Sequence, residues 1–189
     1  MNEVRAAIVG VGNCASSLVQ GIEYYKNAEK GDHIPGLMHV YIGPYHISDI
    51  KIVCAFDVDA DKVGKDFSEA MFSGQNNTIN ISDVPFMDCK VYRGHTLDGL
   101  GQYYSDVLAE HPSEPVNVAD VLARHEVDVL INYLPVGSEK ATHFYVEEAL
   151  KAGCGIVNCI PVFVAKEEIW QGKFRKHGLP IVGDDIKSQ

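Results

Sequence analysis

The sequence lacks the features that mark membrane, secreted and disulfide-bonded proteins. No apolar run reaches the roughly 18–20 residues that a transmembrane helix needs, and the apolar stretch near the N-terminus is too short for a signal peptide. The five cysteines are an odd number and show no C-x-x-C spacing. We therefore expect a cytoplasmic protein, with no membrane association, whose cysteines are mostly buried free thiols.

Metal and nucleic-acid sites are also without support in the sequence. The eight histidines and five cysteines show no closely spaced ligand set, so we expect no metal site. The formal net charge is -10 and no cluster of Lys and Arg occurs, which argues against a nucleic-acid partner. With 189 residues, of which 46% are hydrophobic, the chain is large enough to bury a core as one domain.

The most informative motif that is present lies ten residues into the chain. A short apolar run ending at Val9 meets G-x-G-x-x-A, in which Gly10 permits a tight turn and Gly12 leaves room for a phosphate. Ala15 lets the following helix pack close to the strand. The N–H groups at the start of that helix, which includes Asn13 and Cys14, would point at a pyrophosphate. This pattern predicts a dinucleotide site.

Strand-like and helix-like segments alternate along the chain, which indicates an α/β fold with a doubly wound, mostly parallel sheet of Rossmann type. A segment at 31–49, which contains two prolines, is predicted to be an inserted excursion in one nucleotide-binding domain over 1–189. The polar segment 93–115 is expected to be a loop with a helical stretch after Leu97. The predicted strands cover 5–9, 50–56, 90–92, 127–134, 154–159 and 179–182, and the predicted helices cover 13–28, 60–72, 117–125, 138–151 and 166–176.

Ligands of such folds bind beyond the carboxyl ends of the strands, so the residues there are candidates. Asp57 could accept hydrogen bonds from an adenosine ribose and disfavour a 2′-phosphate, although it lies 47 residues after Gly10, where about 20 is usual. The excursion at 31–49 absorbs the difference. The alternative is that Asp57 only caps the next helix.

Later strand ends carry further polar groups. Leu134 to Ser138 either covers a cofactor or is an ordinary turn with Ser138 as the helix cap, and Asn158 could orient a nicotinamide amide or a substrate hydroxyl. At the last strand end, Asp184 and Asp185 beside Lys187 form either a charged site or a solvated terminus.

Several motifs in this order carry a family resemblance. GVGNCASSLVQG, IPGLMHV, GPYH, AFDVD, NNT, LPVGSE, NCIPVF and GDDIKSQ resemble the inositol-3-phosphate synthase (myo-inositol-1-phosphate synthase) family in its short prokaryotic form. The resemblance runs from Val4 to Gln189, and IPGLMHV and GPYH account for the excursion.

The resemblance implies NAD-dependent isomerisation of D-glucose 6-phosphate to 1D-myo-inositol 3-phosphate. Oxidation at C5, enolisation, intramolecular aldol closure and reduction would follow one another, with NAD regenerated in each turnover. It also implies a homotetramer. Family members of this type are roughly twice as long as this chain, so the catalytic and tetramerisation part would be absent and the isolated chain inactive or weakly NAD-binding.

Residue roles carried over from the family place Lys187 and Asp185 at the chemistry, with Lys187 stabilising developing negative charge; the alternative is that Lys187 is a surface lysine. The cofactor-binding residues that the resemblance implies are Gly10, Gly12, Asn13, Cys14, Ala15, Asp57, Asp66, Asn76, Asn77, Leu134, Pro135, Val136, Gly137, Ser138, Tyr145, Asp184 and Ser188. For Asp66 and Tyr145 the alternative is that each belongs to a helix for structural reasons alone. Two other functions stay open: an ordinary NAD-dependent dehydrogenase, and a non-catalytic NAD-binding regulatory domain.

Overall fold

A parallel six-stranded sheet forms the centre of the molecule. The computed structural model describes residues 3–101 and 107–186. The strands are ordered β5-β4-β1-β6-β7-β8 across the sheet, and each pair that is hydrogen-bonded is parallel. The strands are β1 (Val4–Val9), β4 (Ile50–Asp57), β5 (Val91–Arg93), β6 (Val129–Asn132), β7 (Gly155–Asn158) and β8 (Ile181–Val182). With β1 at the centre and the order reversing beside it, this is the doubly wound arrangement that the sequence predicted.

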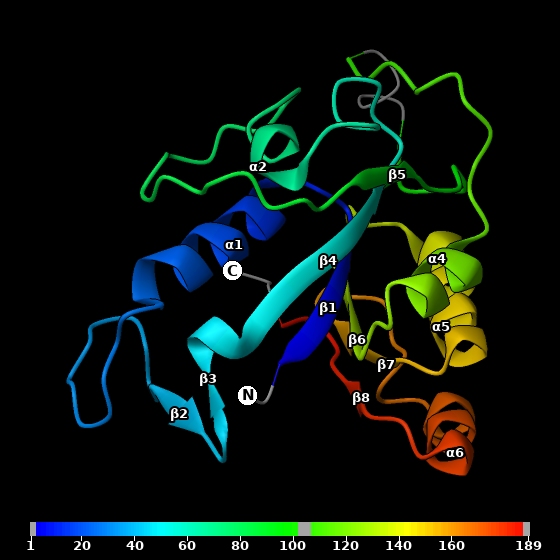
Figure 1. The fold of residues 1–189 in the computed structure, drawn as a ribbon. Helices are drawn as coiled ribbons and strands as arrows, with labels where there is room; N and C mark the ends of the chain where they lie inside the picture. Colours follow the sequence, from blue (N-terminus) through cyan, green and yellow to red (C-terminus); the bar gives the residue numbers. More distant parts are fainter. Residues whose placement is uncertain (1–2, 102–106, 187–189) are drawn as a thin grey trace.

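Helices cover both faces of the sheet (Figure 1). The helix α1 lies on one side, and α4, α5 and α6 lie on the other. The helices are α1 (Asn13–Tyr25), α2 (Phe67–Ala70), α4 (Val118–Arg124), α5 (Glu139–Ala152) and α6 (Glu168–His177). None of the helices in the described parts of the chain combines the length and apolar character that a membrane crossing requires.

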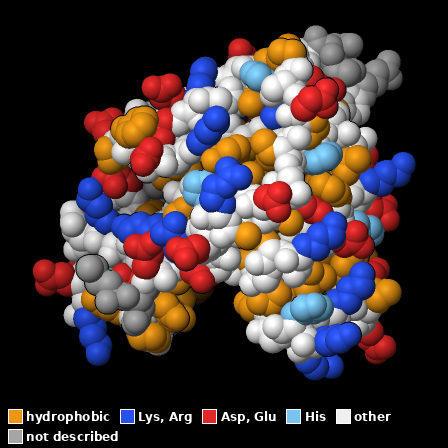
Figure 2. All heavy atoms as spheres, turned by 45° about the vertical axis from the view of Figure 1, so that its right-hand side comes forward, with side chains coloured by type: hydrophobic (Ala, Val, Ile, Leu, Met, Phe, Trp, Pro, Cys, Tyr) orange, Lys and Arg blue, Asp and Glu red, His pale blue; other side chains and the backbone are white. Residues whose placement is uncertain are grey.

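The alternation of side chains along β1 divides the core into two layers. Ala6 and Ile8 share one buried cluster with Val19 of α1, whereas Ala7 and Val9 share another with residues of α4 and α5. A strand buried on both faces reads as a continuous apolar run, which is why this segment was recognisable as a strand. Outside the core, Figure 2 shows one face of the molecule, on whose described residues acidic and basic side chains are interspersed.

The inserted segment forms a small excursion beside the sheet. It contains a two-stranded antiparallel hairpin, β2 (Tyr41–Ile42) and β3 (Tyr45–His46), followed by a short 3-10 helix, η1 (Ile47–Asp49), which leads directly into β4. The imidazole Nε2 of His46 lies 3.0 Å from the carbonyl oxygen of Ala28, which ties the hairpin to the chain beyond α1. The insertion therefore lengthens the connection between β1 and β4 without changing the sheet order.

The helix predicted over 60–72 is wrong. Residues 60–64 form turns, and α2 covers four residues. Backbone pairing with β5 and the residues just before it competes with helix formation here. Gly64 N–H donates to Val91 C=O, and Val91 N–H donates to Lys65 C=O. Phe67 N–H donates to Cys89 C=O. These bonds hold the chain around Asp66, whose backbone is extended, against the segment 89–91, so the helix begins only after Asp66.

The cysteines follow the prediction. All five are free thiols, four of them buried, and Cys14 is half-buried. Burial raises the pKa of Cys54 to about 12, so its thiol stays protonated and behaves as a small apolar group. The helical stretch predicted after Leu97 reaches into 102–106 and so lies partly outside the described residues.

The cap of α5 also differs from the prediction. Ser138 occupies the N-cap position without making a side-chain cap hydrogen bond, and its buried hydroxyl has no partner among the described residues. Instead, the carboxylate of Asp98 accepts hydrogen bonds from the N–H groups of Lys140, at 2.7 Å, and Ala141, at 2.9 Å. A residue from a distant loop thus caps the helix, which no local pattern could reveal.

We expect Asp98→Ala to lower the free energy of unfolding by about 1 kcal/mol, because two N–H groups of the first turn lose their acceptor. The matched variant Ser138→Ala should leave it unchanged within about 0.5 kcal/mol, or raise it, because that hydroxyl makes no bond. Urea denaturation followed by circular dichroism measures both. A larger loss for Ser138→Ala than for Asp98→Ala would contradict this assignment of the cap.

Candidate functional site

A cavity of about 160 Å³ lies at the carboxyl ends of β1, β4 and β6. Its wall includes the glycine turn after β1, the acidic turn after β4, and the segment after β6 that contains Leu134 and Pro135. This is the crevice where doubly wound sheets bind their ligands, at the point where the strand order reverses. The position of the cavity therefore agrees with the strand-end rule applied to the sequence.

Gly10 is required by the backbone of the first turn. Its φ is +89°, and a Cβ at this position would lie 2.6 Å from the carbonyl oxygen of Tyr133. Its N–H donates to the carbonyl oxygen of Phe56 at 2.9 Å. The turn thus packs directly between the ends of β4 and β6, and a side chain there would separate them.

Gly12 serves a different purpose, because it borders the cavity. A Cβ at Gly12 would meet no atom within 4 Å and would project into open space. The helix α1 that follows has no side-chain cap and no acidic residue in its first turn. The first N–H groups of a helix have no partner within the helix, so this end suits a phosphate.

The residues that follow Gly12 divide between the cavity and the core. Asn13 lines the cavity, whereas Cys14 and Ala15 do not, and Ala15 is fully buried against the sheet. Ala15 therefore does what the motif assigns to it, which is to allow close packing of helix and strand.

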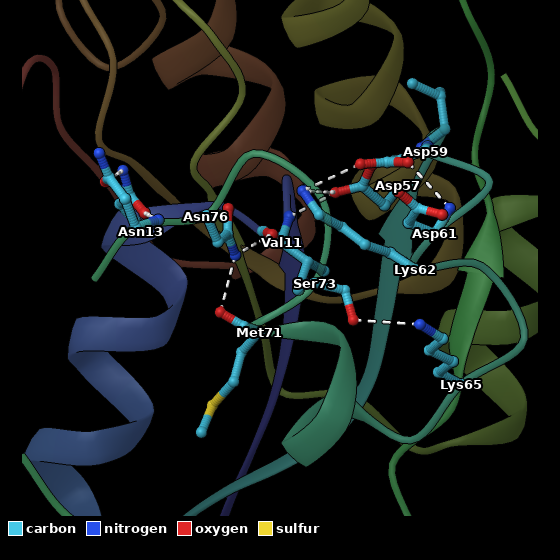
Figure 3. Close-up of polar contacts among 12 residues, drawn as sticks. Val11, Asn13, Asp57, Asp59, Asp61, Lys62, Lys65, Met71, Ser73 and Asn76 are labelled. Atoms are coloured by element: carbon cyan, nitrogen blue, oxygen red, sulfur yellow. Dashed lines mark hydrogen bonds and ion pairs between the residues drawn. The ribbon is translucent and has the colours of Figure 1, made fainter. Parts of the chain in front are cut away.

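Two asparagines hold a later loop against the glycine turn. Asn13 Nδ2 donates to Asn77 Oδ1 at 2.8 Å, and Asn77 N–H donates back to Asn13 Oδ1 at 3.0 Å. Asn76 Nδ2 donates to the carbonyl oxygens of Val11, at 3.1 Å, and Met71, at 2.8 Å (Figure 3). Asn76 lines the cavity, whereas Asn77 does not and is bonded to Asn13, which does.

Asp57 joins the end of β4 to the same turn. Its Oδ2 accepts a hydrogen bond from Val11 N–H at 2.8 Å, and its Oδ1 accepts from Val58 N–H at 2.7 Å and Asp59 N–H at 3.0 Å. No helix begins here, so the alternative that Asp57 caps the next helix is wrong; that role belongs to Asp66 and α2. Contact between Asp57 and a ribose stays a prediction, for which its place in the cavity wall is suitable.

Two buried charges beside Asp57 were missed by the sequence reading. Asp59 and Lys62 line the cavity, and the Lys62 ammonium lies 3.5 Å from Asp59 Oδ2 and 4.0 Å from Asp57 Oδ2 (Figure 3). The side chains of Lys62 and Asp59 are 7% and 5% exposed. Lys62 fell within the helix predicted over 60–72, whereas the structure has a turn there that brings it to the cavity beside Asp59.

A loop after β5 closes another side of the cavity, and the sequence did not identify it. His95, Leu97 and Asp98 lie in the wall. Arg93 holds the base of this loop, because its Nη2 donates to Thr96 Oγ1 and Glu110 Oε2, each at 2.8 Å. Arg93 is 7% exposed, so the anchor joins a buried guanidinium to the carboxylate of Glu110, which lies at the surface.

The segment from Leu134 to Ser138 only partly faces the cavity. Leu134 and Pro135 line it, whereas Val136, Gly137 and Ser138 do not. Farther along α5, Tyr145 is buried and lines the cavity, and its contact with a cofactor stays a prediction. Burial raises the pKa of Tyr145, against the effect of a hydrogen bond with the backbone of His95, so the phenol remains a neutral hydroxyl.

Asp66 and Asp184 do not line the cavity. Asp66 accepts hydrogen bonds from the N–H groups of Ser68, Met87 and Cys89, at 3.0, 3.1 and 2.8 Å. Burial opposes ionisation of Asp66, but a hydrogen bond from the Ser68 hydroxyl and these backbone bonds outweigh it and hold its pKa below the usual range. Its place in the structure explains its acidity without a ligand.

Asp184 is likewise bonded within the protein. It accepts from the N–H groups of Val164, at 2.9 Å, and Ala165, at 3.0 Å, and from Asn158 Nδ2 at 2.7 Å. Asn158 also receives a bond from Asn132 Nδ2 at 2.8 Å. Asn158 is fully buried, so the structure does not support the ligand role suggested for its amide.

The remaining predicted residues lie near the end of the chain. Asp185 is exposed, and its N–H donates to the carbonyl oxygen of Ile160 at 3.2 Å. Lys187 and Ser188 lie outside the described residues. Within 3–101 and 107–186, no group of three or more His, Cys, Asp or Glu is placed to hold a metal ion.

Comparison with known proteins identifies the relatives of this chain. It is 59% identical over 187 residues to an inositol-3-phosphate synthase of Mycolicibacterium smegmatis, covering 99% of this chain and 52% of that protein. It is 58% identical over 187 residues to an inositol-3-phosphate synthase of Mycobacterium tuberculosis, covering 99% of this chain and 51% of that protein. The chain thus spans about half the length of the curated relatives it matches.

A solved structure supports the fold. The crystal structure of Ari2 aligns with a TM-score of 0.81 at 30% identity, covering 97% of this chain and 54% of that one. No family model matches the sequence.

We expect Gly10→Ala to destabilise the protein by about 1–3 kcal/mol, because of its left-handed φ and the contact with Tyr133. Gly12→Ala should cost less than about 1 kcal/mol, because its φ is −103° and the added methyl group meets no atom. Chemical denaturation of the two variants tests this contrast between a glycine required by the turn and one that leaves space. Equal losses in both would show that Gly12 is also required by packing.

Proposed function

Because the chain belongs to the inositol-3-phosphate synthase family over the segment that it shares with its relatives, we propose that it forms the NAD-binding part of such an enzyme. The proposed reaction is isomerisation of D-glucose 6-phosphate to 1D-myo-inositol 3-phosphate by oxidation, enolisation, aldol closure and reduction. The observation that carries the proposal is the identity of 58–59% to synthases over 187 residues.

The residues of the cavity fit a dinucleotide. The uncapped end of α1 supplies N–H donors for a diphosphate, and Gly12 leaves the space that the diphosphate needs. The Asp57 carboxylate is fixed at the end of β4, where it can accept from ribose hydroxyls. When bound, NAD would accept a hydride from the substrate and return it, so that the overall reaction is redox-neutral.

The chain's own residues would bind the cofactor and exclude water from it. Phe56, Leu97 and Leu134 give the cavity apolar walls, and the Arg93 anchor keeps the loop after β5 in place over it. Tyr145 presents a neutral hydroxyl, which can donate a hydrogen bond and does not bring a negative charge to the site.

Other parts of the proposal concern residues and partners beyond this cavity. Lys187 would stabilise negative charge on the substrate, Asp185 would assist it, and Asp184 and Ser188 would stand near the nicotinamide. Homotetramer formation is proposed from the family resemblance. The 189-residue chain by itself would bind NAD weakly and turn over no substrate, because it spans about half the length of its relatives.

The whole gene product is expected to convert D-glucose 6-phosphate, in the presence of NAD, to inositol 3-phosphate without net accumulation of NADH. Gly12→Val is the matched control: its side chain would occupy the diphosphate position and weaken NAD binding by at least about tenfold. Chromatography of the sugar phosphates measures the conversion of substrate, and ultraviolet absorbance measures the accumulation of NADH.

The rival functions give different results in the same assay. Stoichiometric NADH formation would identify an ordinary dehydrogenase, and NAD binding with unchanged sugar phosphate would identify a regulatory domain. Either result overturns the synthase proposal. Turnover by the isolated 189-residue chain would overturn the proposal that it is inactive alone.

A further inference from the structure

The strap, residues 97–101 of the loop after β5, closes one side of the candidate cavity. Leu97, Asp98 and Leu100 belong to the cavity wall. With the strap in place the cavity measures about 160 Å³. Pockets that take up drug-sized ligands measure about 300–1,000 Å³, and a dinucleotide is larger than most such ligands. The cavity therefore has to widen before a dinucleotide can occupy it.

Both ends of the loop that carries the strap are fixed to the domain. Arg93 donates hydrogen bonds to Thr96, just before the strap, and to Glu110, after it. Its Nε also donates to the carbonyl oxygen of His111 at 3.1 Å. The His111 N–H in turn donates to Val58 C=O, beyond the end of β4, at 2.9 Å. The strap can therefore move outward while the ends of the loop stay in place.

The Asp98 carboxylate holds the strap against the start of α5. It accepts hydrogen bonds from Lys140 N–H at 2.7 Å and from Ala141 N–H at 2.9 Å. Beside it, Gly99 has a φ of +83° and packs on Ser138, since a Cβ at Gly99 would clash with Ser138 Oγ. Because Asp98 is only half-buried, water can replace its partners when the strap moves away.

Ser138 gives α5 a second cap, which is idle in this structure. It occupies the N-cap position, and its buried hydroxyl has no hydrogen-bond partner among the described residues. A serine at the N-cap ordinarily accepts from the second or third N–H of the helix. In α5 these are the N–H groups of Lys140 and Ala141, the same two that Asp98 occupies. Either side chain can therefore cap this helix, but only Asp98 needs the strap to be closed.

We propose that the strap is a gate to the cofactor cavity, which is closed while Asp98 caps α5 and opens when Ser138 becomes the cap instead. In the closed state the strap narrows the cavity. In the open state the first turn of α5 stays capped and the cavity can admit a dinucleotide, so the gate has two states of similar free energy. The proposal rests on the proposed NAD-binding function and adds to it the step that controls access.

Two simpler accounts of Asp98 make different predictions. If Asp98 is only a structural cap, its removal lowers stability and leaves the rate of cofactor binding unchanged. If its charge repels the incoming phosphates, its removal raises that rate. In both accounts the loss of the Ser138 hydroxyl has no effect on the rate. The behaviour of Ser138 therefore distinguishes a gate from either alternative.

The experiment measures the association rate constant of NADH with the whole gene product by stopped-flow fluorescence. Asp98→Ala should raise this constant by about fivefold, because the closed state loses its cap. Ser138→Ala should lower it by about fivefold, because the open state loses its cap and the closed state does not. The double variant should return to within about twofold of the wild type, since both states are then uncapped.

Two further variants control for charge and for folding. Asp61 is exposed and lies outside the cavity wall, so Asp61→Asn should leave the association rate constant within about twofold of the wild type. Gly99→Ala should raise it by at least about fivefold, because its methyl group displaces the strap from Ser138 and strains the left-handed backbone. Melting temperatures show whether each variant is folded. If Asp98→Ala does not fold, Ser138→Ala and Gly99→Ala still decide.

An association rate constant that Ser138→Ala leaves unchanged would overturn the proposal. A constant that is no higher in folded Asp98→Ala than in the wild type would overturn it as well. Failure of the proposed function gives a different result. In that case the folded wild type binds no NADH, and the assignment of a dinucleotide to this cavity fails together with the gate.

Discussion

The hydrogen bond from Val11 N–H to the Asp57 carboxylate, 2.8 Å long, is the contact on which the candidate site depends. It joins the turn after β1 to the end of β4, two segments that are 46 residues apart in the sequence. Because it fixes the carboxylate beside the start of α1, a single cavity has uncapped N–H groups that suit a phosphate near an acid that suits a ribose. The Asn76 bond to Val11 C=O adds the loop after α2 to the same turn.

The sequence was sufficient for the features that depend on local pattern. The apolar runs at Ala6–Val9 and Ile52–Phe56 are buried on both faces, so they were recognisable as central strands, and the sheet order followed from their alternation with helices. The helix predicted over 117–125 is confirmed as α4, and Asn117 caps it, because an N-cap acts on residues close by in the chain. The roles of Gly10 and Gly12 were also predictable, since each depends on the absence of a side chain.

Features determined by distant partners were not predictable. Asp98 caps α5 from a loop about 40 residues earlier, which leaves Ser138 without the expected role. The segment 64–67 pairs with 89–91 and so cannot continue a helix. For the same reason the predicted helix over 60–72 did not reveal Lys62, which the turn directs into the cavity beside two carboxylates. These outcomes share one cause: tertiary hydrogen bonds outweigh local propensity.

The most direct test of the account is hydrogen–deuterium exchange of the chain with and without NAD. At the start of α1, the N–H groups of residues 12–15 lack a helix cap, so NAD should slow their exchange, and that of 57–59, while the β2–β3 hairpin exchanges as before. NAD binding that leaves the exchange of residues 12–15 unchanged would contradict the assignment of the phosphate site to this turn.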